Sequence, residues 1–149
     1  MFKVLKLILI IIFISSSTYS DEKITFLSLK SDKVNVRYGP GLNFPIKFIY
    51  KKKSLPVKVI DSKENFRKII DHKKNSGWIH RVMLKKSDSL IVINDQILFK
   101  KPSKFSEPMA RLEKGRLAYI KKCITNWCKI KTGDFIGWLE TESVWGISN

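Results

Sequence analysis

The stretch Asn35-Val36-Arg37-Tyr38-Gly39-Pro40-Gly41 decides how the rest of the chain is interpreted. Val34 and Val36 alternate with polar neighbours, which predicts a short strand with one buried face. Glycine adopts backbone conformations closed to other residues and proline stiffens a turn, so the Gly-Pro-Gly triplet predicts a shaped loop after that strand. A short strand followed by such a loop favours a β-rich fold.

The same pattern continues along the chain. Apolar residues alternate with period two at residues 46–50 and 57–59, and turn-forming residues gather at 73–77 and 132–134. Residues 21–149 contain no long segment with a helical period. Short strands separated by turns every 8–12 residues predict the all-β class and small barrels.

The two halves of this region resemble each other in sequence, which indicates an internal repeat. The segments that correspond, in order, are 34–37 with 97–100, Pro45 with Pro108, 48–49 with 111–112, 54–55 with 115–116, 65–69 with 126–130, and 77–79 with 137–139. We therefore predict two tandem small β-barrels, at residues 24–86 and 89–149, joined by the polar stretch 85–89.

The first twenty residues have the features of a secretory signal peptide. Lys3 and Lys6 precede an unbroken apolar run at 7–14, and small residues at 18 and 20 stand before a plausible cleavage site at Asp21. An uncleaved anchor is the alternative, but a spanning helix needs about 20 apolar residues. We predict a signal peptide at 1–20, no transmembrane anchor after cleavage, and export to the periplasm or cell envelope.

Cys123 and Cys128 are the two cysteines of the chain. They flank four residues and would face each other across a tight hairpin, so a disulfide is expected in an oxidising compartment. A zinc site would need two more ligands, and both histidines lie in the other repeat. We expect no metal site and no cofactor.

The chain is strongly basic, with 29 Lys and Arg against 13 Asp and Glu and a net charge of +16. In an exported protein this charge favours wall polymers, anionic lipids or acidic partners over nucleic acid. Lysine supplies most of it, whereas base recognition favours arginine. The lysine runs at 51–53, 85–86 and 100–101 allow weak contact with anionic surfaces, although solubility explains them as well.

The stretch 35–45 resembles the signature of bacterial SH3 domains, which begin with N-V-R-x-G-P-G and end with G-W-V. Phe66-Arg67-Lys68-Ile69 and Gly77-Trp78-Ile79 match the later elements. The second repeat lacks the N-V-R-x-G-P-G element but keeps Trp127-Cys128-Lys129-Ile130 and Gly137-Trp138-Leu139. The layout is similar to that of exported tandem bacterial SH3 proteins.

This resemblance implies a binding module with a peptide groove beside the long first loop. The candidate ligand-binding residues that it places there are Arg37, Tyr38, Asn43, Phe44, Trp78 and His80. Arginine could pair with the carboxylates of wall peptides, and the aromatic rings supply rigid contact area. The second repeat lacks the motif, so its groove is less well supported.

Catalytic motifs are missing from the sequence after residue 20, and the carboxylates are few and scattered. We therefore predict a protein that is not an enzyme and that binds peptidoglycan or cell-wall peptides. The alternatives are an adaptor that docks another exported protein and an electrostatic binder of anionic envelope surfaces. Salt dependence separates the last class from the others.

Overall fold

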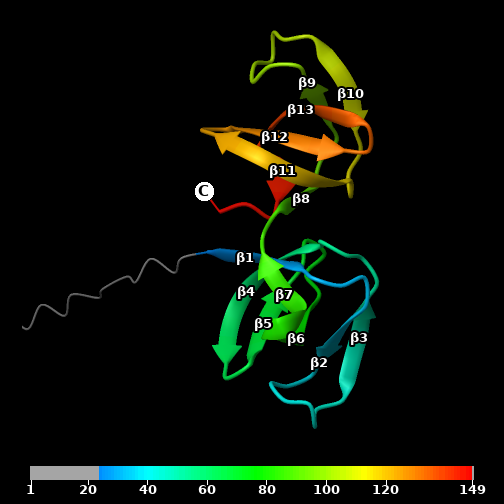
Figure 1. The fold of residues 1–149 in the computed structure, drawn as a ribbon, viewed down its shortest axis with the longest axis vertical. Helices are drawn as coiled ribbons and strands as arrows, with labels where there is room; N and C mark the ends of the chain where they lie inside the picture. The colour runs from blue at the N-terminus through cyan, green and yellow to red at the C-terminus, as the bar shows by residue number, and fades with distance from the viewer. Residues whose placement is uncertain (1–23, 149) are drawn as a thin grey trace, which may run out of the picture.

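The computed structural model describes residues 24–148, and these residues form strands and one short 3-10 helix (Figure 1). The predicted signal peptide at 1–20 lies outside the described residues. The first half contains β1 (Thr25–Leu29), β2 (Val34–Arg37), β3 (Ile46–Tyr50), β4 (Pro56–Lys63), β5 (Phe66–Ile70), β6 (Ser76–His80), η1 (Arg81–Met83) and β7 (Leu84–Lys86). The second half contains β8 (Ser89–Val92), β9 (Gln96–Phe99), β10 (Pro108–Leu112), β11 (Leu117–Ile124), β12 (Trp127–Thr132), β13 (Phe135–Glu140) and β14 (Val144–Trp145). Within 24–148 no helix is long and apolar enough to cross a membrane.

The two halves have the same sheet topology. The first sheet has the order β3-β2-β6-β5-β4-β1-β7, and the second has the order β10-β9-β13-β12-β11-β8-β14. Each strand of the first sheet therefore corresponds to the strand seven places later in the second sheet. The strand pairs are antiparallel throughout both sheets. This correspondence confirms the all-β class and the internal repeat.

The structure corrects the register of the repeat at its first strand. Arg37 is the register partner of Trp78, and Phe99 is the partner of Trp138. Phe99, not Lys100, is therefore the counterpart of Arg37, and the sequence alignment at this strand was wrong by one residue. Matching the two prolines caused the slip, because Pro45 precedes β3 whereas Pro108 is the first residue of β10.

Each half encloses its own apolar core, and a glycine lets two strands approach closely in both. A Cβ atom at Gly77 would lie 2.4 Å from Val36 Cγ1, and one at Gly137 would lie 2.7 Å from Leu98 Cγ. Val36 and Leu98 are fully buried. The glycine of each G-W element therefore lets β6 lie close against β2 and β13 lie close against β9.

The two halves also share an interface. Trp145 of β14 packs against the core of the first half, together with Ile91 and Leu117. Its indole Nε1 donates a hydrogen bond to the carbonyl oxygen of Pro56 at 3.2 Å, and its ring meets Phe26 edge to face at 5.2 Å. The second half thus covers part of the first core.

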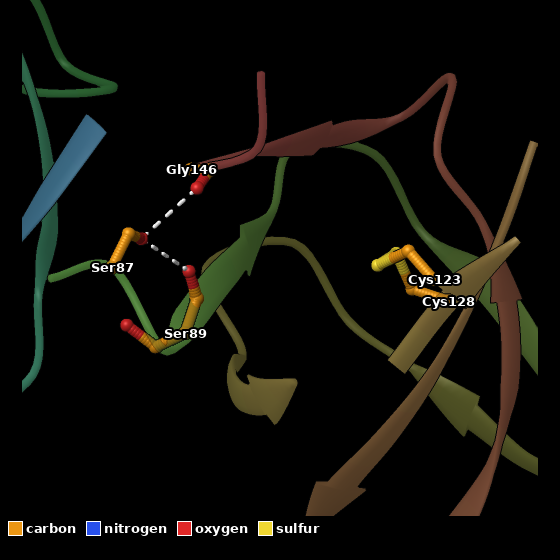
Figure 2. The surroundings of a disulfide bond; sticks show 5 residues. All are labelled: Ser87, Ser89, Cys123, Cys128 and Gly146. Carbon is orange, nitrogen blue, oxygen red and sulfur yellow. Dashed lines mark hydrogen bonds between the residues drawn. A yellow bond between two sulfur atoms is a disulfide. The ribbon is translucent and has the colours of Figure 1, made fainter. Parts of the chain in front are cut away.

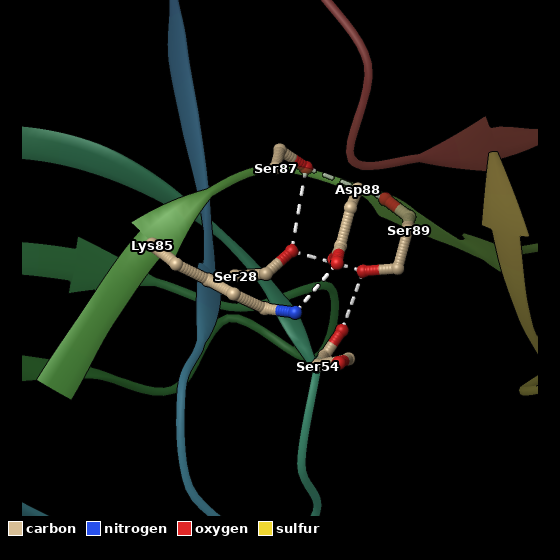
Figure 3. Close-up of polar contacts among 6 residues, drawn as sticks. All are labelled: Ser28, Ser54, Lys85, Ser87, Asp88 and Ser89. Carbon is tan, nitrogen blue, oxygen red and sulfur yellow. Dashed lines mark hydrogen bonds and ion pairs between the residues drawn. The ribbon is translucent and has the colours of Figure 1, made fainter. Parts of the chain in front are cut away.

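A cluster of hydroxyl groups fixes the connection between the halves (Figure 3). The hydroxyls of Ser28 and Ser89, both fully buried, are hydrogen-bonded at 2.9 Å, and Ser89 donates to the carbonyl oxygen of Ser54. Lys85 and Asp88 form an ion pair beside them. Buried polar groups that are satisfied in this way favour one arrangement of a linker.

The predicted disulfide is confirmed. Cys123 and Cys128 are register partners at the end of the β11–β12 hairpin and are joined by a disulfide bond, with their Cα atoms 4.1 Å apart (Figure 2). The nearby Ser87 hydroxyl donates to the carbonyl oxygen of Gly146 at 3.1 Å. The second half therefore carries a covalent cross-link that the first half does not have.

Candidate binding groove

The outer face of the first sheet carries a groove of about 420 Å³. Its residues come from the start of β2, the β2–β3 loop, the end of β6 and η1. The lining consists of Lys33, Asn35, Arg37, Leu42, His80, Val82 and Met83.

Strand alternation explains why three of the predicted residues share this face. Val34 and Val36 of β2 are buried, so Arg37 points outward. Trp78 is opposite Arg37 on β6, and His80 follows it two residues later on the same face. Arg37, Trp78 and His80 therefore lie on one outer surface, with Arg37 and His80 in the groove itself.

The loop after β2 is held by Arg37 and Phe44. The Arg37 Nη1 group donates a hydrogen bond to the carbonyl oxygen of Phe44 at 2.7 Å. The Phe44 ring covers Gly39 so closely that a Cβ atom there would lie 2.3 Å from it, and a Cβ atom at Gly41 would lie 2.4 Å from the Asn43 side-chain oxygen. The two glycines have no positive φ. The prediction that they supply special backbone angles was wrong, because the loop needs them for space.

His80 is oriented by two neighbours. Its ring packs edge to face on Phe66 at 5.0 Å, and its Nδ1 atom accepts a hydrogen bond from the Val82 backbone at 3.4 Å. This hydrogen bond places the proton of the neutral ring on Nε2, which is the atom left to donate to a ligand.

The other predicted residues do not line the groove. Tyr38 is 63% exposed, and its ring lies under the Lys47 ammonium group at 5.7 Å. Asn43 and Phe44 lie in the β2–β3 loop, and Trp78 lies on β6 beside the groove. Sequence reasoning missed Lys33, Leu42, Val82 and Met83. Val82 lies two residues after β6 and is exposed, and its sequence position alone did not mark it as part of a groove.

The groove is basic, whereas the same position of the second half is acidic. The lining of the groove includes Lys33, Arg37 and His80 and no carboxylate. Their counterparts in the corrected register are Asp95, Phe99 and Glu140. A hollow of about 450 Å³ includes Glu140 but neither Asp95 nor Phe99, and it is lined by Asn126, Glu140, Thr141, Glu142, Val144 and Ile147. Both carboxylates form ion pairs, Asp95 with Arg111 and Glu140 with Lys104, so the second half lacks the unpaired basic groups of the groove.

A larger hollow of about 670 Å³ lies where the two halves meet, next to Cys123. Lys86 is the one charged residue in its lining. Across residues 24–148, no group of three or more His, Cys, Asp and Glu side chains is placed to hold a metal ion. The groove on the first sheet is therefore the best candidate for ligand recognition.

Comparison with known proteins identifies the class. The bacterial SH3 domain family matches residues 30–86 and again residues 94–146, so the chain belongs to this family as a tandem of two such domains. No curated protein has a matching sequence.

Two solved structures are similar to this chain at low sequence identity. NlpC2 from Trichomonas vaginalis matches with a TM-score of 0.38 and 14% identity over 85% of this chain and 49% of its own. NlpC1 from the same organism matches with a TM-score of 0.37 and 13% identity over 87% of this chain and 47% of its own. This chain spans about half the length of these structures.

Proposed function

We propose that the protein is an exported, non-catalytic binding module whose first domain recognises cell-wall peptides. The observation that carries this proposal is the groove of the first domain, where three basic side chains surround apolar contacts without any lining carboxylate. Membership of the bacterial SH3 family supports a binding role.

The lining suggests how a wall peptide would bind. The Arg37 guanidinium is the group best suited to a peptide carboxylate, because its planar fork makes two parallel hydrogen bonds. Lys33 and His80 add donors on either side. Leu42, Val82 and Met83 would contact short apolar side chains of the peptide, while Tyr38 and Trp78 extend the surface beyond the groove.

Co-sedimentation with purified peptidoglycan tests the proposal. The protein should be retained at moderate and at high salt, because buried contacts are screened less than exposed charges. An Arg37→Ala/His80→Ala variant should bind at least about tenfold more weakly, as expected when central interface residues are removed. Lys121→Ala, an exposed lysine of the second domain, is the control.

Two results would contradict the proposal. Release of the unmodified protein at high salt would indicate diffuse charge attraction. Absence of sedimentation at any salt concentration would exclude the wall ligand and favour an exported protein partner.

A further inference from the structure

A second basic site lies at the junction of the two domains, away from the groove. It is a cleft of about 370 Å³ formed by the β3–β4 loop of the first domain and the β10–β11 turn of the second. The lining consists of Lys52, Glu113, Lys114, Gly115, Arg116 and Leu117. Lys52 is the contribution of the first domain to this lining, and the other five residues belong to the second.

The two segments of the cleft are counterparts in the repeat. The Leu55 amide donates to the Lys52 carbonyl oxygen at 3.4 Å, and the Arg116 amide donates to the Glu113 carbonyl oxygen at 3.1 Å. Leu117 packs against the core of the first domain, which fixes the second turn against the first domain. The cations of both segments are thus brought to one place by a packed interface.

The positive charge of the cleft is only partly neutralised within the protein. Four ion pairs form among residues 24–148, and none includes Lys52, Lys114 or Arg116. Glu113 is the single carboxylate of the lining. Asp95 accepts a hydrogen bond from the Lys114 backbone amide at 2.8 Å, but its ion pair is with Arg111. The lining therefore keeps three cations against one carboxylate, which makes it attractive to an anion.

The pKa of His72, in the turn after β5, is affected by the same positive charges. Burial lowers its pKa, Asp71 opposes this effect, and the positive charges of Lys73, Lys52 and Lys114 lower the pKa further. Its Nδ1 atom is buried without a hydrogen-bond partner. Lysines of both domains therefore lower the pKa of the His72 imidazole.

Asp71, next to His72, accepts hydrogen bonds from several donors of the first domain. Its carboxylate accepts hydrogen bonds from the Tyr50 hydroxyl at 3.0 Å and from the backbone amides of Lys73 and Asn75 at 2.8 and 2.9 Å. It is buried and turned toward these donors. Its negative charge acts on His72, but Asp71 does not line the cleft.

We propose that the interdomain cleft binds a phosphate group between Lys52 and the Lys114–Arg116 turn. Lysine ammonium groups bind phosphate as point charges, and the arginine fork adds two directed hydrogen bonds. The phosphate belongs either to a soluble ester or to a lipid headgroup, which present the same chemistry to the cleft. This site does not depend on the peptide groove of the first domain.

NMR titration with glycerol 3-phosphate at constant pH and ionic strength tests the soluble form. The backbone amides of 114–116 should shift on binding, and the pKa of His72 should rise because the anion offsets the neighbouring lysines. Co-sedimentation with phosphatidylglycerol vesicles, compared with phosphatidylcholine vesicles, tests the lipid form.

A charge-matched pair of variants decides between a site and general attraction. Lys52→Gln/Lys114→Gln should weaken binding by about tenfold or more, as expected for the loss of two charge-assisted contacts. Lys121→Gln/Lys131→Gln removes the same charge from exposed positions of the second domain and should change binding less than about twofold. All four lysines are exposed, so the melting temperatures should stay equal.

The outcomes separate cleanly. Sensitivity of glycerol phosphate binding to the cleft variant alone supports a soluble ester as ligand, and the same sensitivity for vesicles alone supports a headgroup. Equal weakening by both variants would overturn the proposal, and so would the failure of both assays, that is, no shift of residues 114–116 or of the His72 pKa with glycerol 3-phosphate together with no preference for phosphatidylglycerol vesicles.

Discussion

The two domains have one topology but different side chains on their outer faces. Their inward positions carry the same kind of residue, as Val36 and Leu98 do on β2 and β9. Their outward positions differ, since Arg37 and His80 of the first domain correspond to Phe99 and Glu140 of the second. A duplicated barrel therefore keeps the chemistry of its core while the face that meets ligands diverges.

The domains also differ in how they are stabilised. The second has the Cys123–Cys128 disulfide. The first has no cross-link, but Trp145 of the second domain packs against its core. Barrels of this size bury a modest share of their surface, so each needs such support.

The largest effect is expected from removing the Trp145 side chain, which packs against the core of the first domain. Trp145→Ala should lower the free energy of unfolding of the first domain by about 3 kcal/mol, because a large packed ring and its hydrogen bond to Pro56 are lost. Amide hydrogen exchange of β2 and β5 measures this change. A loss confined to the second domain would contradict the described interface.

The disulfide should stabilise the second domain. Cys123→Ser/Cys128→Ser should lower the stability of the second domain by about 2 kcal/mol, since the loop that the bond closes is short. Hydrogen exchange of β11 and β12 measures it, with reduction of the unmodified protein as a second route to the same state. Equal loosening of both domains would show that they unfold as a single unit.

A buried polar pair gives a smaller effect in the first domain. Burial, and then the Asp71 carboxylate, raises the pKa of Tyr50, so the hydroxyl stays protonated and donates to Asp71. Tyr50→Phe should cost about 1 kcal/mol in urea unfolding at pH 7.

The pH dependence of this pair follows from the sign of the shift. A pKa raised in the folded state gives stability that is present below about pH 10, the ordinary value of tyrosine, and is lost as the pH rises above it. Tyr50→Phe should reduce this alkaline loss. An unchanged alkaline limb in the variant would assign the loss to other groups.

The smallest effect is expected at the acidic face of the second domain. Lys104 and Glu140 form an ion pair at 3.2 Å with Lys104 largely exposed. Lys104→Ala should change the free energy of unfolding by less than about 0.5 kcal/mol. A loss above about 1 kcal/mol in chemical denaturation would show that this face has a structural role.

Local patterns in the sequence predicted the local features of the structure. Alternation identified the buried valines of β2, and cysteine spacing identified the disulfide. The register of the repeat was wrong by one residue at Arg37, because a proline fits equally well before a strand and at its first position. The tight turn predicted at Gly39-Pro40-Gly41 is present, with the Gly41 amide donating to the Gly39 carbonyl oxygen at 3.0 Å, but Gly39 is needed for space beside Phe44 and not for a positive φ.

Most features that join distant segments were missed, although the resemblance correctly placed Arg37, Trp78 and His80 on one face. The groove combines Arg37 of β2 with Val82 and Met83 of η1. Trp145 reaches Pro56 across 89 residues of sequence. The spacing of residues along a chain contains no information on such meetings, which depend on how the two sheets close and pack.

The most direct test of the central claim is an NMR titration of the isotopically labelled protein with a soluble wall stem peptide. We predict chemical-shift changes at Lys33, Arg37, His80 and Val82 of the first domain, and none at the equivalent Glu140 and Glu142 of the second. Shifts confined to the acidic face of the second domain, or spread evenly over exposed lysines, would contradict the assignment of the first domain as the one that binds the ligand.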